Sequence, residues 1–301
     1  MLIISNIVLL ILFVMDIHNS QVIMDIKEQN IKIFQDTMHR IDTSKTLTES
    51  VEYSIANQVF YSDNSALETY ELVKSRILNF DEPAKIVVTK NSTFNAARNY
   101  NGKVCVLNFA SATNPGGGVD KGATAQEECL CRTSTLYKCL NTPGVKEVFY
   151  IPHRKSGTPL HNDDILYTPD VTIIKSDNYN SLFMHKKVNV ITCAAPNLRI
   201  TPANAYNHEN GEGVKISDED LFKLHVERAH KILACAAIYN NETVILGAFG
   251  CGAFKNPPEI VAEAYKKVIS EYFMYTFKTI EFAVYCRSDM TNYEIFNKIL
   301  G

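Results

Sequence analysis

Short apolar blocks alternate with longer amphipathic stretches from residue 86 to the end of the chain. Apolar runs of about four to eight residues are typical of buried strands, and apolar positions three and four apart are typical of helices. The pattern predicts strands over Ile86–Lys90, Val104–Ala110, Val148–Pro152, Val171–Ser176, Val188–Ala195, Thr243–Phe249 and Thr279–Arg287. It predicts helices over Thr93–Asn99, Cys129–Leu140, Asp218–Tyr239, Pro258–Phe273 and Asn292–Leu300. This alternation indicates an α/β fold with a mostly parallel or mixed sheet between helices.

The N-terminal part of the chain has a different pattern. Residues 26–85 are polar-rich with helical spacing, which predicts a helical extension before an α/β domain at 86–301. Residues 1–25 include an apolar run from Ile7 to Met15 that no Lys or Arg precedes. The run is shorter than the roughly 20 residues of a membrane span. Three interpretations stay open for this segment: a mis-called start before Met24, a signal peptide or anchor, and a helix packed on the domain.

Composition and charge narrow the functional classes. Apolar residues make up 46% and charged residues 21% of the chain, which is typical of a globular protein. The net charge of −3 offers no broad electrostatic attraction for nucleic acid or for an anionic membrane. Several of the eight cysteines, such as Cys105 and Cys193, lie inside apolar runs. We therefore expect reduced thiols and an intracellular compartment, cytoplasmic or nuclear, unless the first 25 residues direct the chain elsewhere.

A glycine triplet and an acidic pair follow the expected strand Val104–Ala110. The triplet is Gly116–Gly118, and Gln126, Glu127 and Glu128 come after a seven-residue spacer. Glycines let backbone N–H groups approach an anionic or sugar ligand closely. Because ligands bind beyond the carboxyl ends of strands in open α/β sheets, this segment is a candidate site.

A second glycine loop follows the expected strand Thr243–Phe249. It contains Gly250, Cys251 and Gly252, and a helix that starts with proline comes next, so the loop suits a diphosphate held by backbone amides. A dinucleotide dehydrogenase is disfavoured because Lys255 stands where a third glycine is required. The chain has no G-K-[ST] sequence, which excludes a P-loop. The cysteine spacing matches no common zinc site.

Together, these segments resemble the signature of bacterial-type poly(ADP-ribose) glycohydrolases: a glycine triplet, six to eight residues, then Gln-Glu-Glu. Leu130–Arg132, Ala194–Asn197 and Gly247–Phe254 extend the resemblance, which covers about Arg40 to the C-terminus. The resemblance implies a three-layer α/β/α macrodomain-like mixed sheet with an N-terminal helical extension. It also implies ADP-ribose or poly(ADP-ribose) as ligand, with ADP-ribosylated proteins as partners and no metal or organic cofactor.

The resemblance also assigns roles to particular residues. Glu128 would be the catalytic acid and Glu127 would contact the substrate near the scissile bond. The residues expected to bind substrate are Asn108, Asn114, Gly116, Gly117, Gly118, Gln126, Asn197, Gly250, Cys251, Gly252, Ala253 and Phe254. Asparagines at strand ends also serve turns, so Asn108, Asn114 and Asn197 keep that second interpretation.

Physical chemistry supports one acid rather than two. Glycosidic cleavage needs a carboxyl that stays protonated near neutral pH, and burial beside a like charge favours this. Glu127 and Glu128 are adjacent, so they should titrate as a coupled pair. Consecutive residues on a helix point in different directions, which argues against two acids flanking one bond. Our hypothesis is that Glu128 serves as general acid and then as base, while Glu127 holds ribose hydroxyls and Gln126 positions the pair.

We therefore predict an enzyme that hydrolyses ribose–ribose O-glycosidic bonds in poly(ADP-ribose). Two alternatives stay open, a hydrolase of single ADP-ribose units and a non-catalytic ADP-ribose-binding module. We expect a monomer with no sequence-specific nucleic-acid partner and no firm membrane partner.

Overall fold

A seven-stranded mixed sheet forms the centre of the molecule in the computed structural model, which describes residues 26–202 and 213–301. The strands are β1 Val59–Tyr61, β2 Lys85–Thr89, β3 Val104–Phe109, β4 Ile165–Lys175, β5 Ser181–Cys193, β6 Thr243–Leu246 and β7 Thr279–Ala283. Their order is β1-β4-β5-β3-β6-β7-β2. β5, β3, β6, β7 and β2 run parallel, and β4 is antiparallel to both β1 and β5.

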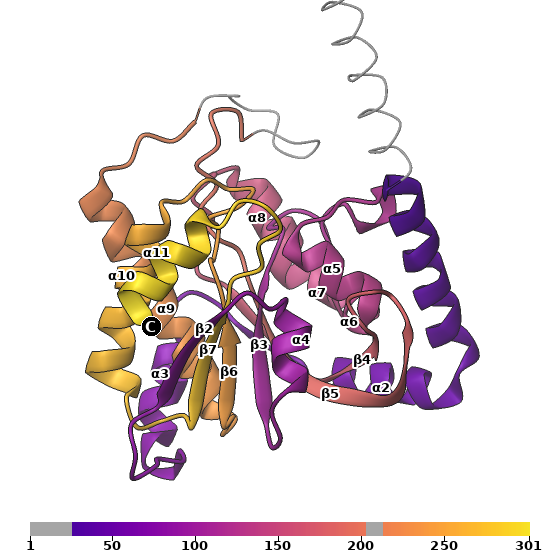
Figure 1. The fold of residues 1–301 in the computed structure, drawn as a ribbon, viewed down its shortest axis with the longest axis horizontal. Coiled ribbons are helices and arrows are strands. Elements are labelled where there is room, and N and C mark those ends of the chain that lie inside the picture. The colour runs from indigo at the N-terminus through magenta and orange to yellow at the C-terminus, as the bar shows by residue number, and fades with distance from the viewer. Residues whose placement is uncertain (1–25, 203–212) are drawn as a thin grey trace, which may run out of the picture.

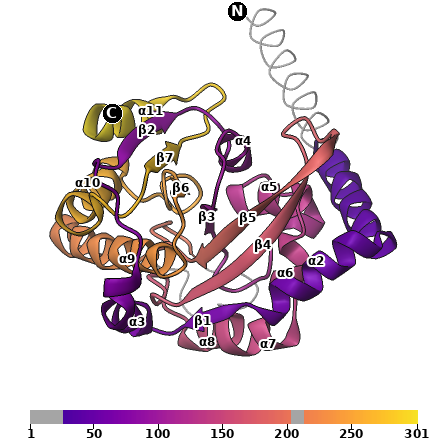
Figure 2. The ribbon, with the colours of Figure 1, turned by 90° about the horizontal axis from the view of Figure 1, so that it is seen from below.

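Helices cover both faces of this sheet (Figures 1 and 2). The α-helices are α2 Lys45–Ala56, α3 Ser65–Val73, α4 Thr93–Arg98, α5 Gln126–Thr133, α6 Leu136–Leu140, α7 Pro143–Val145, α8 Ile151–Ser156, α9 Asp218–Ile238, α10 Pro258–Val268 and α11 Thr291–Leu300. Residues 26–43 are also helical. η1 Lys74–Arg76 and η2 Val119–Lys121 are 3-10 helices, and η3 Lys146–Tyr150 and η4 Ile269–Phe273 are π-helices. α3, α9, α10 and α11 lie on one face, and α4 to α8 lie on the other (Figure 1).

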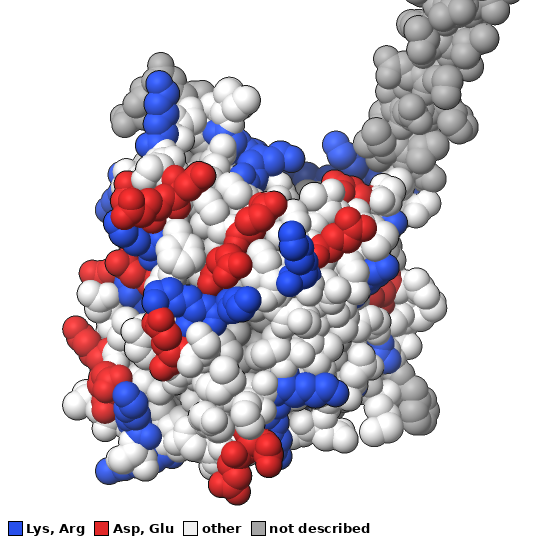
Figure 3. Space-filling view, turned by 60° about the vertical axis from the view of Figure 1, so that its left-hand side comes forward, with Lys and Arg blue, Asp and Glu red and all other residues white. Residues whose placement is uncertain are grey.

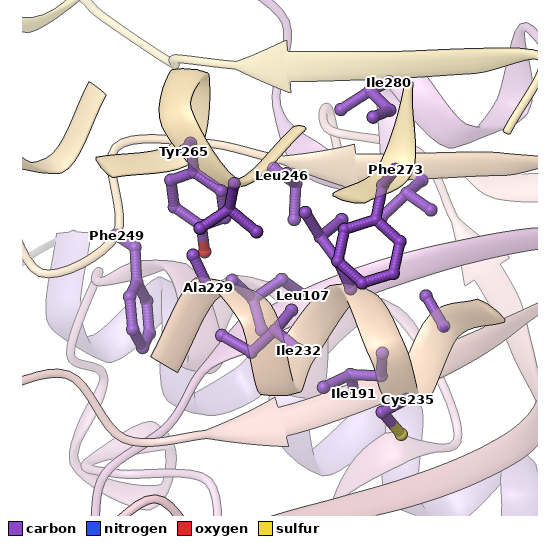
Figure 4. Close-up of a cluster of buried hydrophobic side chains, with 14 of the residues drawn as sticks. Leu107, Ile191, Ala229, Ile232, Cys235, Leu246, Phe249, Tyr265, Phe273 and Ile280 are labelled. Carbon is purple, nitrogen blue, oxygen red and sulfur yellow. The ribbon is translucent and has the colours of Figure 1, made fainter. Parts of the chain in front are cut away.

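Strand β3 contributes to a hydrophobic core on each face. Cys105 and Leu107 pack with residues of α9 and α10, as Figure 4 shows for Leu107 and Ile232. Val104 and Val106 pack with residues of α4, α5 and α6. Because successive side chains of a strand point to opposite faces, a strand buried on both sides reads as an unbroken apolar run.

Most of the expected elements are present, but the expected strand Val148–Pro152 is wrong. These residues lie in η3 and α8. Thr142 caps the preceding turn by accepting a hydrogen bond from Val145 N–H, and Pro143 occupies its first turn. Phe149 and Tyr150 are fully buried side by side, so tertiary packing outweighs the strand preference of this apolar and aromatic run.

Other elements also differ from the sequence-based expectation, and β4 and β5 begin six and seven residues earlier than expected, at Ile165 and Ser181. Residues 26–85 include the strand β1, which pairs with β4 through Val59 and Tyr167. The expected helix Cys129–Leu140 is split into α5 and α6, because Ser134 adopts extended backbone and bridges to Ile173. β6 and β7 end earlier than expected, and their last expected residues belong to loops at the carboxyl edge of the sheet.

Acidic and basic side chains are interspersed on the face drawn in Figure 3, in agreement with the small net charge. Among the helices of the described ranges, none is both long and apolar enough to span a bilayer. The apolar run Ile7–Met15 lies outside the described residues.

Candidate active site

A cavity of about 1,060 Å³ lies at the carboxyl edge of the parallel strands. The loops that follow β2, β3, β5, β6 and β7 all contribute to its wall, and residues 26–30 add one side of it. This is the position where open α/β sheets bind ligands, and the volume is at the upper end of the range of about 300–1,000 Å³ for small-molecule sites.

The glycine triplet is shaped by the carboxylates that it surrounds. Gly116 and Gly117 have φ angles of +68° and +60°, a region that favours glycine. A Cβ on Gly117 would overlap Glu128 Oε1 and would lie 3.4 Å from Glu127 Oε2. Gly118 N–H donates to Glu128 Oε1 over 2.9 Å. The two acids of α5 thus converge on one glycine although they are adjacent in sequence.

Glu127 is buried, with 2% of its surface exposed, and both of its carboxyl oxygens accept hydrogen bonds. Ser111 N–H donates to Oε2 over 2.7 Å, and Asn108 Nδ2 donates to Oε1 over 3.2 Å. Burial raises the pKa of Glu127 to about 8, and the neighbouring Glu128 carboxyl raises it further, while the hydrogen bond from Ser111 opposes this. Near neutral pH, the Glu127 carboxyl therefore retains a proton.

Glu128 is also buried and lines the cavity. Gly118 holds Oε1, whereas Oε2 has no hydrogen-bond partner among the described residues. This oxygen is itself shielded from solvent, and it lacks the hydrogen-bond partner that buried polar atoms normally have.

Gln126 fastens the start of α5 to the end of β3. Its Oε1 accepts from Phe109 N–H over 2.8 Å, and its Nε2 donates to Leu107 O over 2.7 Å. Nε2 also donates to Thr93 Oγ1 over 3.0 Å. With its amide used in this way, Gln126 fixes the position of both acids.

The three asparagines have different environments. Asn114 lines the cavity and donates to Gly117 O, so it shapes the glycine turn. Asn108 lies behind Glu127, donates to Thr192 Oγ1 as well, and keeps its Oδ1 without a partner in the described part of the chain. Asn197 lines the cavity and accepts from Arg199 Nε over 3.1 Å.

The second glycine loop presents unpaired backbone amides. The N–H groups of Gly250, Gly252, Ala253 and Phe254 have no acceptor within residues 26–202 and 213–301. Successive free N–H groups in a turn make an anion-binding concavity. Cys251 is an exception, because its N–H donates to Ala248 O over 3.1 Å and its side chain lies behind the cavity wall. Phe254 lines the cavity, and the Arg199 guanidinium lies 5.9 Å from its ring centroid.

The helix of residues 26–43 contributes to the cavity, which the sequence pattern did not indicate. Ile26, Gln29 and Asn30 line it. Asn30 Nδ2 donates to Gly122 O over 3.1 Å, in the spacer between the glycines and the acids. Gly122 has a φ of +74°, and a Cβ there would overlap the carbonyl oxygen of Lys27. These contacts span about 90 residues of sequence, so no local pattern could have indicated them.

Arg132 follows the acids and is fully buried. It donates to Ala123 O and, over 3.2 Å, to Cys129 Sγ. No group of three or more His, Cys, Asp or Glu side chains in the described ranges is arranged to hold a metal ion.

Comparison with known proteins identifies the family. The model of the microbial-type PARG catalytic domain, where PARG is poly(ADP-ribose) glycohydrolase, matches residues 28–176. The PARG of Thermomonospora curvata is 27% identical over 91% of this chain and 100% of its own, with a TM-score of 0.78. The same protein bound to the inhibitor ADP-HPD gives 27% identity over 90% and 99%, with a TM-score of 0.75.

The PARG of Deinococcus radiodurans in complex with ADP-ribose is 30% identical over 82% of this chain and 96% of its own, with a TM-score of 0.71. No curated protein matches the chain. The expected macrodomain-like α/β fold and the expected family are thereby confirmed. The chain belongs to the microbial-type poly(ADP-ribose) glycohydrolase family and is a glycohydrolase enzyme.

Proposed function

We propose that this enzyme hydrolyses ribose–ribose O-glycosidic bonds in poly(ADP-ribose) and releases ADP-ribose, with Glu128 as general acid and then general base. The family supports the reaction, and the relatives solved with ADP-ribose or ADP-HPD support the ligand. ADP-ribosylated proteins would carry the substrate. The eight unpaired cysteines support an intracellular compartment.

The observation that carries the proposal is the environment of Glu128. The residue lines the cavity, one of its oxygens is fixed by Gly118 N–H, and the other is buried without a hydrogen-bond partner among the described residues. In the first step, Glu128 would give a proton to the departing oxygen while the C1–O bond breaks and positive charge develops on the ribose. Water would then attack C1 and return a proton to the Glu128 carboxylate. The reaction consumes one water molecule: the leaving oxygen gains a proton, and C1 gains the hydroxyl group.

Glu127 would hold the proton that this step needs. Its pKa of about 8 means that the Glu127 carboxyl holds a proton near neutral pH. For Glu128 to act as the general acid, this proton would first pass from Glu127 to Glu128. The hydrogen bonds from Ser111 and Asn108 fix Glu127 in place to accept from ribose hydroxyls.

The remainder of the ligand would follow the cavity wall. We place the diphosphate on the amides of Gly250, Gly252, Ala253 and Phe254, whose N–H groups lack acceptors among the described residues. The Phe254 ring would pack on the ligand. In this division of the chain, residues 86–301 are the catalytic domain, and residues 26–85 are an extension that adds the wall around Asn30.

Incubation with labelled poly(ADP-ribose) tests the proposal directly. Glu128→Gln should bind ADP-ribose as the wild type does and should lose about 10²- to 10⁴-fold in kcat. Glu147→Gln, at an exposed position on η3, is the matched control and should keep full turnover. Unchanged turnover in Glu128→Gln would remove this residue from the mechanism.

The same assay, run in parallel on labelled mono-ADP-ribosylated protein, separates the two alternatives. If the wild type releases ADP-ribose only from mono-ADP-ribosylated protein, it is a hydrolase of single units. If it binds the polymer without releasing ADP-ribose, it is a binding module.

A further inference from the structure

Asn256 connects two loops of the cavity wall from inside the protein. It is buried, with 2% of its surface exposed. Its Nδ2 donates to Pro196 O over 2.7 Å and to Gly250 O over 3.0 Å. Its own N–H also donates to Gly250 O, over 3.1 Å. One side chain therefore ties the loop after β5 to the loop after β6.

His225 of α9 holds this amide in place. Its Nε2 lies 2.9 Å from Asn256 Oδ1, and its ring is buried. Because Asn256 Nδ2 already donates to two carbonyls, Oδ1 must be the acceptor, and His225 Nε2 must carry the hydrogen. Burial lowers the pKa of His225 to about 4, so the ring is neutral at physiological pH. No sequence pattern indicated this role, since 31 residues separate the two partners.

The Asn256 amide also packs directly on the glycine turn. Gly250 has a φ of +76°, and a Cβ there would lie 2.5 Å from Asn256 Nδ2 and 2.7 Å from Ala195 Cβ. The carbonyl of Gly250 accepts from Asn256, which does not line the cavity. Because the peptide unit is planar, fixing this carbonyl also fixes the Cys251 N–H, which donates to Ala248 O. The two bonds from Asn256 to Gly250 O close the loop between these residues, and this loop carries the N–H groups of Gly252, Ala253 and Phe254, which lack acceptors in the described chain.

We propose that Asn256 and His225 are positioning residues that hold the amides of the second glycine loop ready for the diphosphate of ADP-ribose. This inference rests on the proposed function, which places the diphosphate on that loop. Neither residue lines the cavity, so both act through the backbone of Gly250. Amides held in a binding orientation before the ligand arrives spare it the cost of ordering the loop.

Three variants test the pair by calorimetric titration with ADP-ribose and by steady-state kinetics on poly(ADP-ribose). Asn256→Ala and His225→Leu should weaken ADP-ribose binding about 10-fold and raise KM similarly, with kcat within about 3-fold of wild type. His225→Gln should restore wild-type binding, because the glutamine Nε2 can donate to Asn256 Oδ1 in place of the imidazole.

Leu233→Ala is the matched control for general destabilisation. Leu233 is fully buried on the same helix, belongs to the hydrophobic core that α9 shares with β3 and α10, and has an apolar side chain that cannot hydrogen-bond to Asn256. If Leu233→Ala lowers the melting temperature as His225→Leu does and weakens binding equally, the positioning role is overturned. It is also overturned if wild type, Asn256→Ala and His225→Leu bind ADP-ribose equally well. A wild type that does not bind ADP-ribose would instead refute the proposed function itself.

Discussion

The Glu128 carboxylate fills the space that a side chain on Gly117 would occupy. A Cβ at this glycine would overlap Glu128 Oε1 and would lie 3.4 Å from Glu127 Oε2. The adjacent Gly118 N–H donates to the same Oε1. The glycine at position 117 therefore has a steric reason. The loop closes on the carboxylates, and only glycine leaves room for them.

Gly117→Ala should displace Glu128 and abolish most of the activity. The overlap with Oε1 forces the carboxylate or the loop to move, and a shift of about 1 Å can cost about 100-fold in rate. The φ of +60° adds about 1–2 kcal/mol of destabilisation for a residue with a Cβ. We expect kcat to fall at least about 100-fold, measured on labelled poly(ADP-ribose).

Gly144→Ala is the control for this substitution. A Cβ at Gly144 meets no atom within 4 Å, and its φ is not positive. Its activity and stability should match those of the wild type. A Gly117→Ala enzyme with wild-type kcat would show that the contact with Glu128 has no catalytic consequence.

Glu127→Gln should change how the stability of the protein depends on pH. The carboxyl has an ordinary pKa of 4.5, which applies to the unfolded chain, and about 8 in the fold. Between these values the unfolded chain releases a proton that the fold keeps, so the wild type loses stability as pH rises from about 4.5 to 8. Each pKa unit corresponds to about 1.4 kcal/mol. The neutral glutamine removes this slope.

Melting temperatures of wild type and Glu127→Gln from pH 5 to pH 8 check this prediction. The variant should gain stability relative to the wild type as the pH rises, by a few kcal/mol at most. Asn108 can turn its amide to accept from the new Nε2, because its Oδ1 has no other partner in the described residues. Parallel curves for the two proteins would contradict the raised pKa.

Sequence reasoning found the parts of the site that are local in the chain. The two glycine loops and the acid pair follow strands whose apolar runs are clear, so their placement at the carboxyl edge could be predicted. The positions of the helices relative to these loops could not be predicted. Asn30 reaches Gly122 and His225 reaches Asn256 across long sequence separations, and both polar side chains are buried by packing that no periodicity encodes.

The fold was predicted less well where secondary-structure preference and packing disagree. Val148–Pro152 has the composition of a strand, yet Phe149 and Tyr150 pack as neighbours on a helical segment. β1 is only three residues long, too short for a period of two to be recognised. The strands of the central sheet were easier, because both of their faces are buried and their sequences are continuously apolar.

Gly252→Ala separates ligand binding from folding. A Cβ at Gly252 meets no protein atom within 4 Å, and the residue lines the cavity with a φ that is not positive. The substitution should leave stability within about 0.5 kcal/mol of the wild type. If the diphosphate lies on the neighbouring amides, the added methyl group should weaken ADP-ribose binding by about fivefold or more, because it obstructs close approach to the backbone. Calorimetric titration measures this, and equal affinity would move the diphosphate away from this loop.

Asn30→Ala should loosen the spacer that joins the glycine triplet to the acids. Asn30 is buried, and its Nδ2 donates to Gly122 O over 3.1 Å. Removing the donor leaves that carbonyl unpaired, at a cost of about 1–3 kcal/mol in the free energy of unfolding. The spacer leads directly to Glu127 and Glu128, so a looser spacer should hold these two acids less firmly. We therefore also expect kcat to fall about 3- to 10-fold. Lys32→Ala, at an exposed position on the same helix, should change neither quantity. An Asn30→Ala enzyme with reduced stability and unchanged kcat would limit the helix to a structural role.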